Sequence, residues 1–154
     1  MRRKFWRWFA LLPCLAPSTT LAEEAAKPPP DLSEIRVVAQ GLKDSKGRMF
    51  CILYEAANAK DYPTRPEHAA MKTSSPIVEK AATCTFAGVK PGTYAVAVFH
   101  DENDNGKLDT GFLGIPTEPT GASNDARGSM GPPKFKDAQF PYTGGALVLK
   151  VKLD

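Results

Sequence analysis

Long hydrophobic runs are absent from this sequence of 154 residues. The apolar stretch Trp8–Ala16 is far shorter than the ~20 residues that a membrane-spanning helix needs. We therefore expect no integral membrane span. A long apolar pattern of helical period is also missing, which argues against a helical domain.

Cysteine and histidine are scarce, with three and two residues. Cys14 lies in the first 22 residues, which are interpreted below as a secretory signal peptide. The other two, Cys51 and Cys84, lie in stretches with strand character. An even pair in an exported chain most economically forms a disulfide, so we predict that these two cysteines are bonded. His68 lies in an irregular stretch and is interpreted as a solvated side chain, which leaves His100 as the histidine of interest.

A basic stripe is the third absence. The formal charge of +3 includes Arg2, Arg3, Lys4 and Arg7, and no acid precedes Glu23, so the chain after residue 22 carries −1. Nucleic acids and anionic membrane surfaces recruit proteins through clustered cations. We therefore do not expect nucleic acid as a partner.

Residues 1–22 have the three parts of a secretory signal peptide. A basic start is followed by the apolar stretch Trp8–Ala16 and by Thr20–Ala22, which offers small residues for cleavage after Ala22. Fainter resemblances to a lipoprotein box, at Leu11–Cys14, and to a twin-arginine signal, at Arg2–Trp6, leave the destination unchanged. We expect export to the periplasm or the extracellular space.

Residues 23–31 form a Pro-rich leader, in which three consecutive prolines favour a stiff polyproline II spacer. The domain is expected over residues 32–154. Short apolar stretches alternate there with turn clusters, and residues 55–76 are expected to be irregular with one helical turn. The predicted strands are residues 34–40, 48–54, 76–81, 83–86, 93–99 and 146–153.

This pattern predicts an all-β fold, an antiparallel β-sandwich of immunoglobulin-like or prealbumin-like type. The first two strands are expected to form a hairpin through the turn Asp44–Gly47. We expect the domain to be a monomer.

The predicted strand Thr93–Phe99 is apolar on both faces. The opposite sheet can cover one face, and the Gly/Pro-rich segment of residues 100–142 is expected to pack on the other. That segment is too long to be simply a free loop, and it carries six large apolar side chains. They are Phe112, Leu113, Ile115, Met130, Phe135 and Phe140.

The segment begins with oxygen-bearing side chains at alternate positions, followed by a glycine, as in loops that wrap calcium. The candidate metal ligands are Asp101, Asn103, Asn105, the carbonyl of Lys107, and Asp109. Phe112 stands where such a loop has its closing glutamate, so Glu118 or Asp125 would have to complete the site. The alternative is a tight turn at Asn105–Gly106, in which the side chains cap local amides.

Two further sites are candidates. His100 with Asp101 or Asp109 could serve a hydrolase, with Ser123 as nucleophile, although no nucleophile-elbow glycines surround that serine. Polar residues of the segment could line a groove for a glycan or a peptide, or could instead cap turns. These candidate ligand-binding residues are Glu118, Ser123, Asn124 and Asp125, with Arg127 beside them.

Three stretches keep an unusual order of residues: Gly92–Asp109, Phe112–Asn124 and Gly131–Phe140. Together they resemble a bacterial exported family known as domain of unknown function 2141, over roughly residues 35–153. The resemblance implies an exported, transthyretin-like β-sandwich and carries no activity. Residues 86–94 are also similar to adhesin-associated and carboxypeptidase-associated sandwich modules, which are typically non-catalytic.

The leading functional hypothesis is an exported, non-catalytic β-sandwich module of unspecified function. It would bind a ligand, a glycan or an envelope protein, and calcium is its candidate cofactor. One alternative is a hydrolase that uses His100 with loop carboxylates, and another is a purely structural envelope module.

Overall fold

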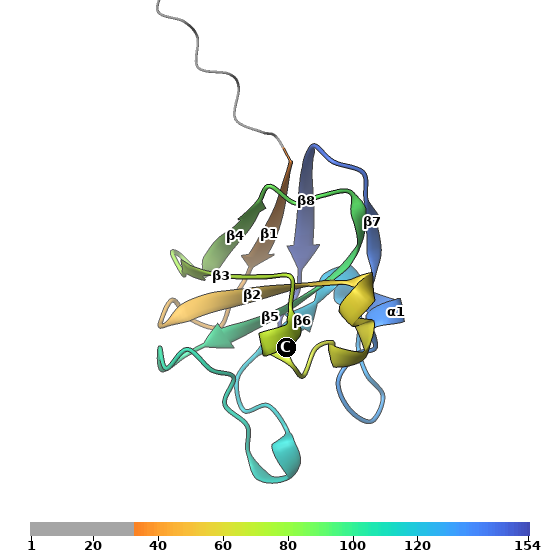
Figure 1. Cartoon of the computed structure of the whole chain (residues 1–154). Helices are drawn as coiled ribbons and strands as arrows, with labels where there is room; N and C mark the ends of the chain where they lie inside the picture. Colours follow the sequence, from red (N-terminus) through yellow and green to blue (C-terminus); the bar gives the residue numbers. More distant parts are fainter. Residues whose placement is uncertain (1–32) are drawn as a thin grey trace, which may run out of the picture.

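A computed structural model describes residues 33–154, so the predicted signal peptide and leader lie outside the described residues. Short strands dominate, and the helical elements are brief (Figure 1). The strands are β1 (Glu34–Gln40), β2 (Arg48–Glu55), β3 (Met71–Pro76), β4 (Ala81–Ala87), β5 (Gly92–Asp101), β6 (Thr120–Ala122), β7 (Phe140–Tyr142) and β8 (Ala146–Val151). The helical elements are the 3₁₀ turns η1 (Ala56–Asp61), η2 (Pro66–His68), η3 (Phe112–Gly114) and η4 (Ser123–Asp125), and the α-helical turn α1 (Phe135–Ala138).

The strands form two sheets. One has the order β4-β1-β8, the other has the order β3-β2-β5-β6, and β7 also pairs with β5. The predicted all-β sandwich is therefore confirmed. Pairing is antiparallel except between β1 and β8, which run parallel with Glu34 opposite Ala146.

The predicted hairpin of the first two strands is wrong, because β1 and β2 belong to different sheets. β1 pairs with β4, and β2 pairs with β3 and β5. Each of the first two strands buries alternate apolar side chains, Ile35 and Val37 in one and Met49 and Leu53 in the other, in the same core between the sheets. The Asp44–Gly47 turn therefore crosses from one sheet to the other.

The structure differs from expectation again between residues 55 and 81. Residues 76–81 form a tight turn with an isolated bridge between Val78 and Ala81, whereas β3 lies in the part expected to be irregular. β3 is mostly polar, so no apolar alternation marks it in the sequence. Its backbone hydrogen bonds with β2 hold it in the sheet.

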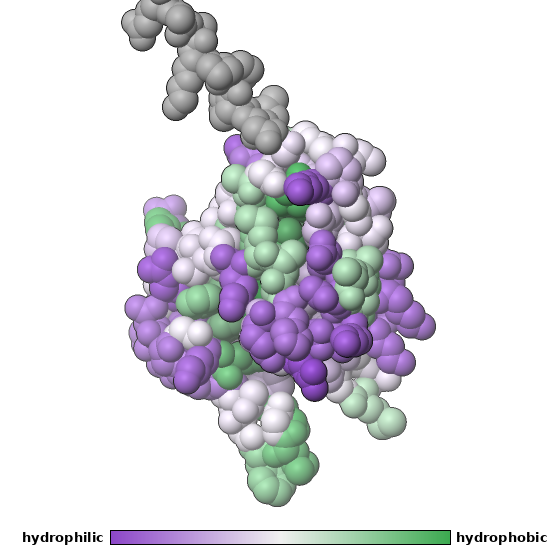
Figure 2. Space-filling model, in the orientation of Figure 1, coloured by the Kyte–Doolittle hydropathy of each residue, from purple (hydrophilic) through white to green (hydrophobic). Residues whose placement is uncertain are grey.

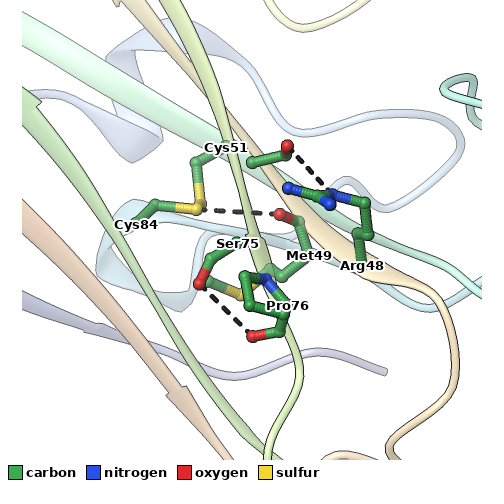
Figure 3. The surroundings of a disulfide bond; sticks show 7 residues. Arg48, Met49, Cys51, Ser75, Pro76 and Cys84 are labelled. Atoms are coloured by element: carbon green, nitrogen blue, oxygen red, sulfur yellow. Dashed lines mark hydrogen bonds between the residues drawn. A yellow bond between two sulfur atoms is a disulfide. The ribbon is translucent and has the colours of Figure 1, made fainter.

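The core between the sheets contains the predicted disulfide, which joins Cys51 of β2 to Cys84 of β4 across 33 positions (Figure 3). Both cysteines are buried, and the Cys84 Sγ lies 3.8 Å from the Met49 carbonyl oxygen. The bond therefore connects the two sheets covalently at the centre of the sandwich.

A second apolar cluster lies on the outer face of β2 and β5. Tyr62, which directly follows η1, and Phe135 of α1 pack there edge to face, with ring centroids 5.8 Å apart. The Gly/Pro-rich segment thus supplies part of the cover for the second face of β5. The buried members of this second cluster are Ile52, Tyr54, Tyr62, Ala95, Phe99, Ala122, Phe135 and Ala138.

Only part of the segment packs in this way. Of the six apolar side chains expected to cover the sheet, Phe135 and Phe140 are buried. The other four are exposed, so the prediction was wrong for Phe112, Leu113, Ile115 and Met130. The first three belong to a loop that projects from the sandwich at the bottom of Figure 1 and closes on itself.

Within residues 33–154, no helix has the length and apolar character required to cross a membrane.

Candidate functional site

His100 and Asp101 end β5, and neither side chain is exposed to solvent. The His100 Nε2 lies 2.7 Å from the Lys46 carbonyl oxygen, so this nitrogen carries the proton and donates it. Nδ1 is buried without a hydrogen-bond partner within the described residues. The Asp44 carboxylate lies 3.9 Å from Nε2. The pKa of Asp44 is lowered, first by the Lys46 amide that donates to it and further by the neighbouring imidazole.

Asp101 accepts hydrogen bonds from the loop that follows it. Its Oδ1 accepts the Asn105 amide at 3.0 Å, and its Oδ2 accepts the Gly106 amide at 2.7 Å. Gly47 lies against the Asp101 backbone, where a Cβ atom would come within 1.8 Å of the carbonyl oxygen. Glycine is therefore required at position 47 for the turn to approach the end of β5.

The amide side chains continue the same pattern. The Asn103 and Asn105 Oδ1 atoms accept the backbone amides two residues ahead, at 3.1 Å and 2.8 Å. Their Nδ2 atoms donate to the two carboxylate oxygens of Asp109, at 2.6 Å and 3.0 Å. The loop is thus closed on itself by its own side chains, as the predicted turn alternative requires.

Glu118 connects the two ends of this loop. Its Oε1 accepts the Glu102 amide and its Oε2 accepts the Asp109 amide, each at 2.9 Å. We call residues 101–109 together with Glu118 the clasp. Asp125, the other acid expected to complete a metal site, instead accepts the Lys152 amide at 3.0 Å.

The donor set of the clasp matches the hard oxygen ligands that calcium prefers, and Gly106 has the positive φ of +76° that such a loop uses at its bend. Of its five carboxylates, Asp101, Asp109 and Glu118 are the ones that accept hydrogen bonds within the clasp. Over residues 33–154, no three His, Cys, Asp or Glu side chains converge in a way that could hold a metal ion. Both carboxylate oxygens of Asp109 accept asparagine hydrogen bonds in this arrangement.

The remaining predicted ligand-binding residues also contact backbone atoms. The buried Ser123 Oγ donates to the Ala138 carbonyl at 2.6 Å and accepts the Val96 amide at 2.9 Å. Asn124 donates to the Gln139 carbonyl at 2.9 Å. Their contacts tie the segment to β5 and α1, and Ser123 forms no hydrogen bond with His100.

The Arg127 guanidinium forms an ion pair with Asp154 on the surface. A nearby hollow of about 150 Å³ is small beside the roughly 300–1,000 Å³ of ligand pockets. It is lined by Val38, Gln40, Asp125, Lys150, Val151 and Lys152.

The sequence interpretation missed one surface feature, the projecting loop of residues 110–117, which we call the apolar finger. Phe112, Leu113 and Ile115 are 87%, 81% and 63% exposed there. The Gly111 amide donates to the Ile115 carbonyl at 2.8 Å and the Thr117 amide donates to the Asp109 carbonyl at 2.9 Å. The sequence did contain a signal for this loop, because its eight residues are uncharged and combine two glycines and a proline with three large apolar side chains.

A family model described as "Uncharacterized protein conserved in bacteria (DUF2141)" matches residues 37–149. This range covers the sandwich from β1 to β8, including the clasp and the finger. No curated protein and no solved structure matches the chain.

Proposed function

Because the chain belongs to the DUF2141 family of uncharacterized bacterial proteins, we propose its function from its own residues: an exported, non-catalytic β-sandwich module that binds an envelope glycan or protein. The observation that carries the proposal is the burial of the His100 side chain. Its imidazole is 0% exposed, and its Nε2–H donates to the Lys46 carbonyl at 2.7 Å. A general base must reach the proton that it abstracts, and this imidazole faces the protein interior.

The carboxylates support the same conclusion. Both oxygens of Asp101 accept loop amides, and both oxygens of Glu118 do so as well. Ser123 is buried and bonded to the backbone. The residues of the hydrolase alternative therefore have structural partners instead of an open cleft.

A macromolecular partner is favoured by an exposed flat surface. Thr85, Arg36 and Val148 lie in register across β4, β1 and β8, and all three are exposed. One face of this sheet is thus open to solvent, and a flat face suits a polymer or a protein better than a small molecule. The disulfide agrees with an oxidising compartment, and residues 1–22 have the pattern of a secretory signal.

The tests of this proposal address export, partner binding and, in the next paragraph, catalysis. Sequencing of the protein recovered from the periplasm should give Glu23 as the first residue. Photo-reactive residues placed at Val148 should cross-link a partner in cells, whereas the same residue at the exposed Lys136 of α1 should not. If neither position cross-links, the purely structural alternative is favoured.

Catalysis is tested with chromogenic ester, phosphate and glycoside substrates. We expect no turnover by the parent protein. Turnover that disappears in a His100→Gln variant, while the variant remains folded by circular dichroism, would favour the hydrolase alternative and contradict the proposal.

We also propose that calcium strengthens the clasp. The supporting observation is that Glu118, distant in sequence from Asp101, adds a carboxylate to the loop through its bonds to both ends. With a dissociation constant of about 10⁻⁴ M, typical of weak extracellular sites, 2 mM Ca²⁺ should raise the melting temperature by roughly 5 °C or more.

The calcium experiment compares melting in Ca²⁺, Mg²⁺ and EDTA. An Asp109→Ala variant should lose the calcium-dependent rise, and an Asp137→Ala variant, altered at an exposed acid of α1, should retain it. No rise in the parent protein would leave the clasp as a purely hydrogen-bonded turn.

A further inference from the structure

Three large apolar side chains gather at the tip of the apolar finger, and its eight residues, 110–117, include no charged side chain. Monomeric proteins rarely leave several such side chains together in water, and grouped exposure marks contact with a protein or a membrane. Figure 2 shows hydrophobic residues at the end of this projection, whereas hydrophilic and hydrophobic residues are interspersed over the rest of the visible face. The finger therefore needs an explanation beyond folding.

The finger holds its shape by its own backbone. Gly111 and Ile115 bond across it, the Gly114 amide donates to the Gly111 carbonyl at 3.2 Å, and Thr110 bridges Pro116. Leu113 has a φ of +62°, a left-handed conformation that costs a leucine energy. The side chain at position 113 is thus held at the tip, 81% exposed, in a preformed turn.

A second loop near the finger also carries an exposed apolar side chain. Met130, which is 100% exposed, belongs to the loop of residues 126–134 between η4 and α1. In Figure 1 this loop and the finger extend toward the same end of the molecule. Two projections at one end can touch a single flat surface at the same time.

We propose that the apolar finger inserts into the surface of a lipid bilayer and attaches the module to it peripherally. This inference goes beyond the proposed function, because it names another surface and another partner, and it depends neither on calcium nor on the exposed sheet.

Three properties favour lipid over a protein partner. The finger is convex, so it can enter a bilayer while the charged body remains in water. It has no charged side chain, and charge is what the hydrocarbon region excludes most strongly. Part of its backbone is internally hydrogen bonded, as a segment that leaves water requires.

The charges near the finger indicate which lipids it should prefer. Four acids and one lysine lie at residues 101–109. The net negative charge of this segment repels anionic headgroups, so attachment should depend on apolar insertion and not on attraction between charges. We therefore expect binding to zwitterionic bilayers that is insensitive to salt.

The test is flotation of the protein, purified as cells produce it, with vesicles of phosphatidylethanolamine and phosphatidylcholine in EDTA. The triple variant Phe112→Ser, Leu113→Asn, Ile115→Thr removes the apolar tip. Asparagine suits the left-handed conformation at position 113, so the finger should keep its shape. We expect the partition coefficient to fall about 10-fold or more.

The matched control is Val78→Thr, which removes a 65% exposed apolar side chain from the turn at residues 76–81 and should leave flotation unchanged. A second readout uses Phe112→Trp. Relative to the parent, its additional fluorescence should shift to the blue when vesicles are added, because the new indole enters lipid.

Several results would overturn the inference. They are no flotation of the parent protein, equal flotation of the triple variant, and binding confined to anionic vesicles and abolished by salt. A finger-dependent complex with a protein, in the absence of vesicle binding, would assign the finger to a protein partner instead. If the parent protein binds no vesicles while the cross-link at Val148 still forms, this inference is contradicted and the proposed function is not.

Discussion

Two parts of the Gly/Pro-rich segment both combine glycine and proline with large apolar side chains, yet one is packed on the sandwich and the other is exposed. Residues 120–125 and 135–140 pack against the sandwich, with Ser123, Phe135 and Ala138 buried, whereas the finger at residues 110–117 projects into solvent. The packed part has anchors on the sheet: β6 pairs with β5, and Ser123 bonds to Val96. The finger bonds to itself and to the clasp. Anchoring to the sheet, more than apolar content, separates the two parts.

The largest expected effect comes from truncating one phenylalanine in each part. Phe135 is 7% exposed and packs against Tyr62, so Phe135→Ala should lower the free energy of unfolding by about 3–5 kcal/mol. Phe112 is 87% exposed, so Phe112→Ala should change it by less than about 0.5 kcal/mol. Urea unfolding of the two variants measures the contrast, and equal losses would show that the finger packs after all.

Removing the disulfide tests whether both parts depend on the same sandwich. Replacing Cys51 and Cys84 together by alanine should lower the stability by about 3–4 kcal/mol, because the bond closes a loop across 33 positions. Thermal melting of this variant, with the oxidised parent as reference, gives the loss. A change below about 1 kcal/mol would indicate that the bond between the sheets contributes little.

Loss of the Ser123 hydroxyl should weaken only the packed part. Ser123→Ala leaves the Val96 amide without its bond at 2.9 Å and the Ala138 carbonyl without its bond at 2.6 Å. A cost of about 1–3 kcal/mol follows for buried polar groups left unpaired. Ser129→Ala, at an exposed position, is the control and should be neutral. Hydrogen exchange should increase at residues 120–140 and not in the finger.

Alkaline pH provides a smaller and more specific perturbation of the packed part. Burial raises the pKa of Tyr62 far above its usual range, and burial, with the charges of Glu67 and Asp61, raises that of Tyr54 to about 12. Both phenols ionise more easily in the unfolded chain, near pH 10. Their contribution to stability is therefore fully present below pH 10 and is lost as pH rises from there toward 12.

The measurement is the alkaline unfolding midpoint, followed by circular dichroism. A Tyr62→Phe variant should unfold at higher pH than the parent, because its ring cannot ionise, although it loses the hydroxyl bond to the Val96 carbonyl at 3.2 Å. A midpoint that does not move would mean that another group controls alkaline unfolding.

Local chemistry explains why parts of this structure could be predicted. The Asp and Asn side chains at alternate positions after β5 bond to amides two to five residues away, so their spacing indicated a closed turn as one of two alternatives, beside a calcium loop. The disulfide also followed from simple counting, because only two cysteines remain after residue 22. Apolar side chains on both faces of β2 and β5 marked them as internal strands.

The sequence by itself therefore determined the fold class, the central strands, the cysteine pair and the closed turn, since each depends on short-range pattern or composition. Only the tertiary structure decided that β1 and β2 face each other across the core, that Glu118 reaches both ends of the clasp, and that His100 is buried. It also decided which part of the Gly/Pro-rich segment is covered. These outcomes depend on contacts between residues far apart in the chain, and glycine- and proline-rich sequences carry no periodicity that indicates which face will be buried.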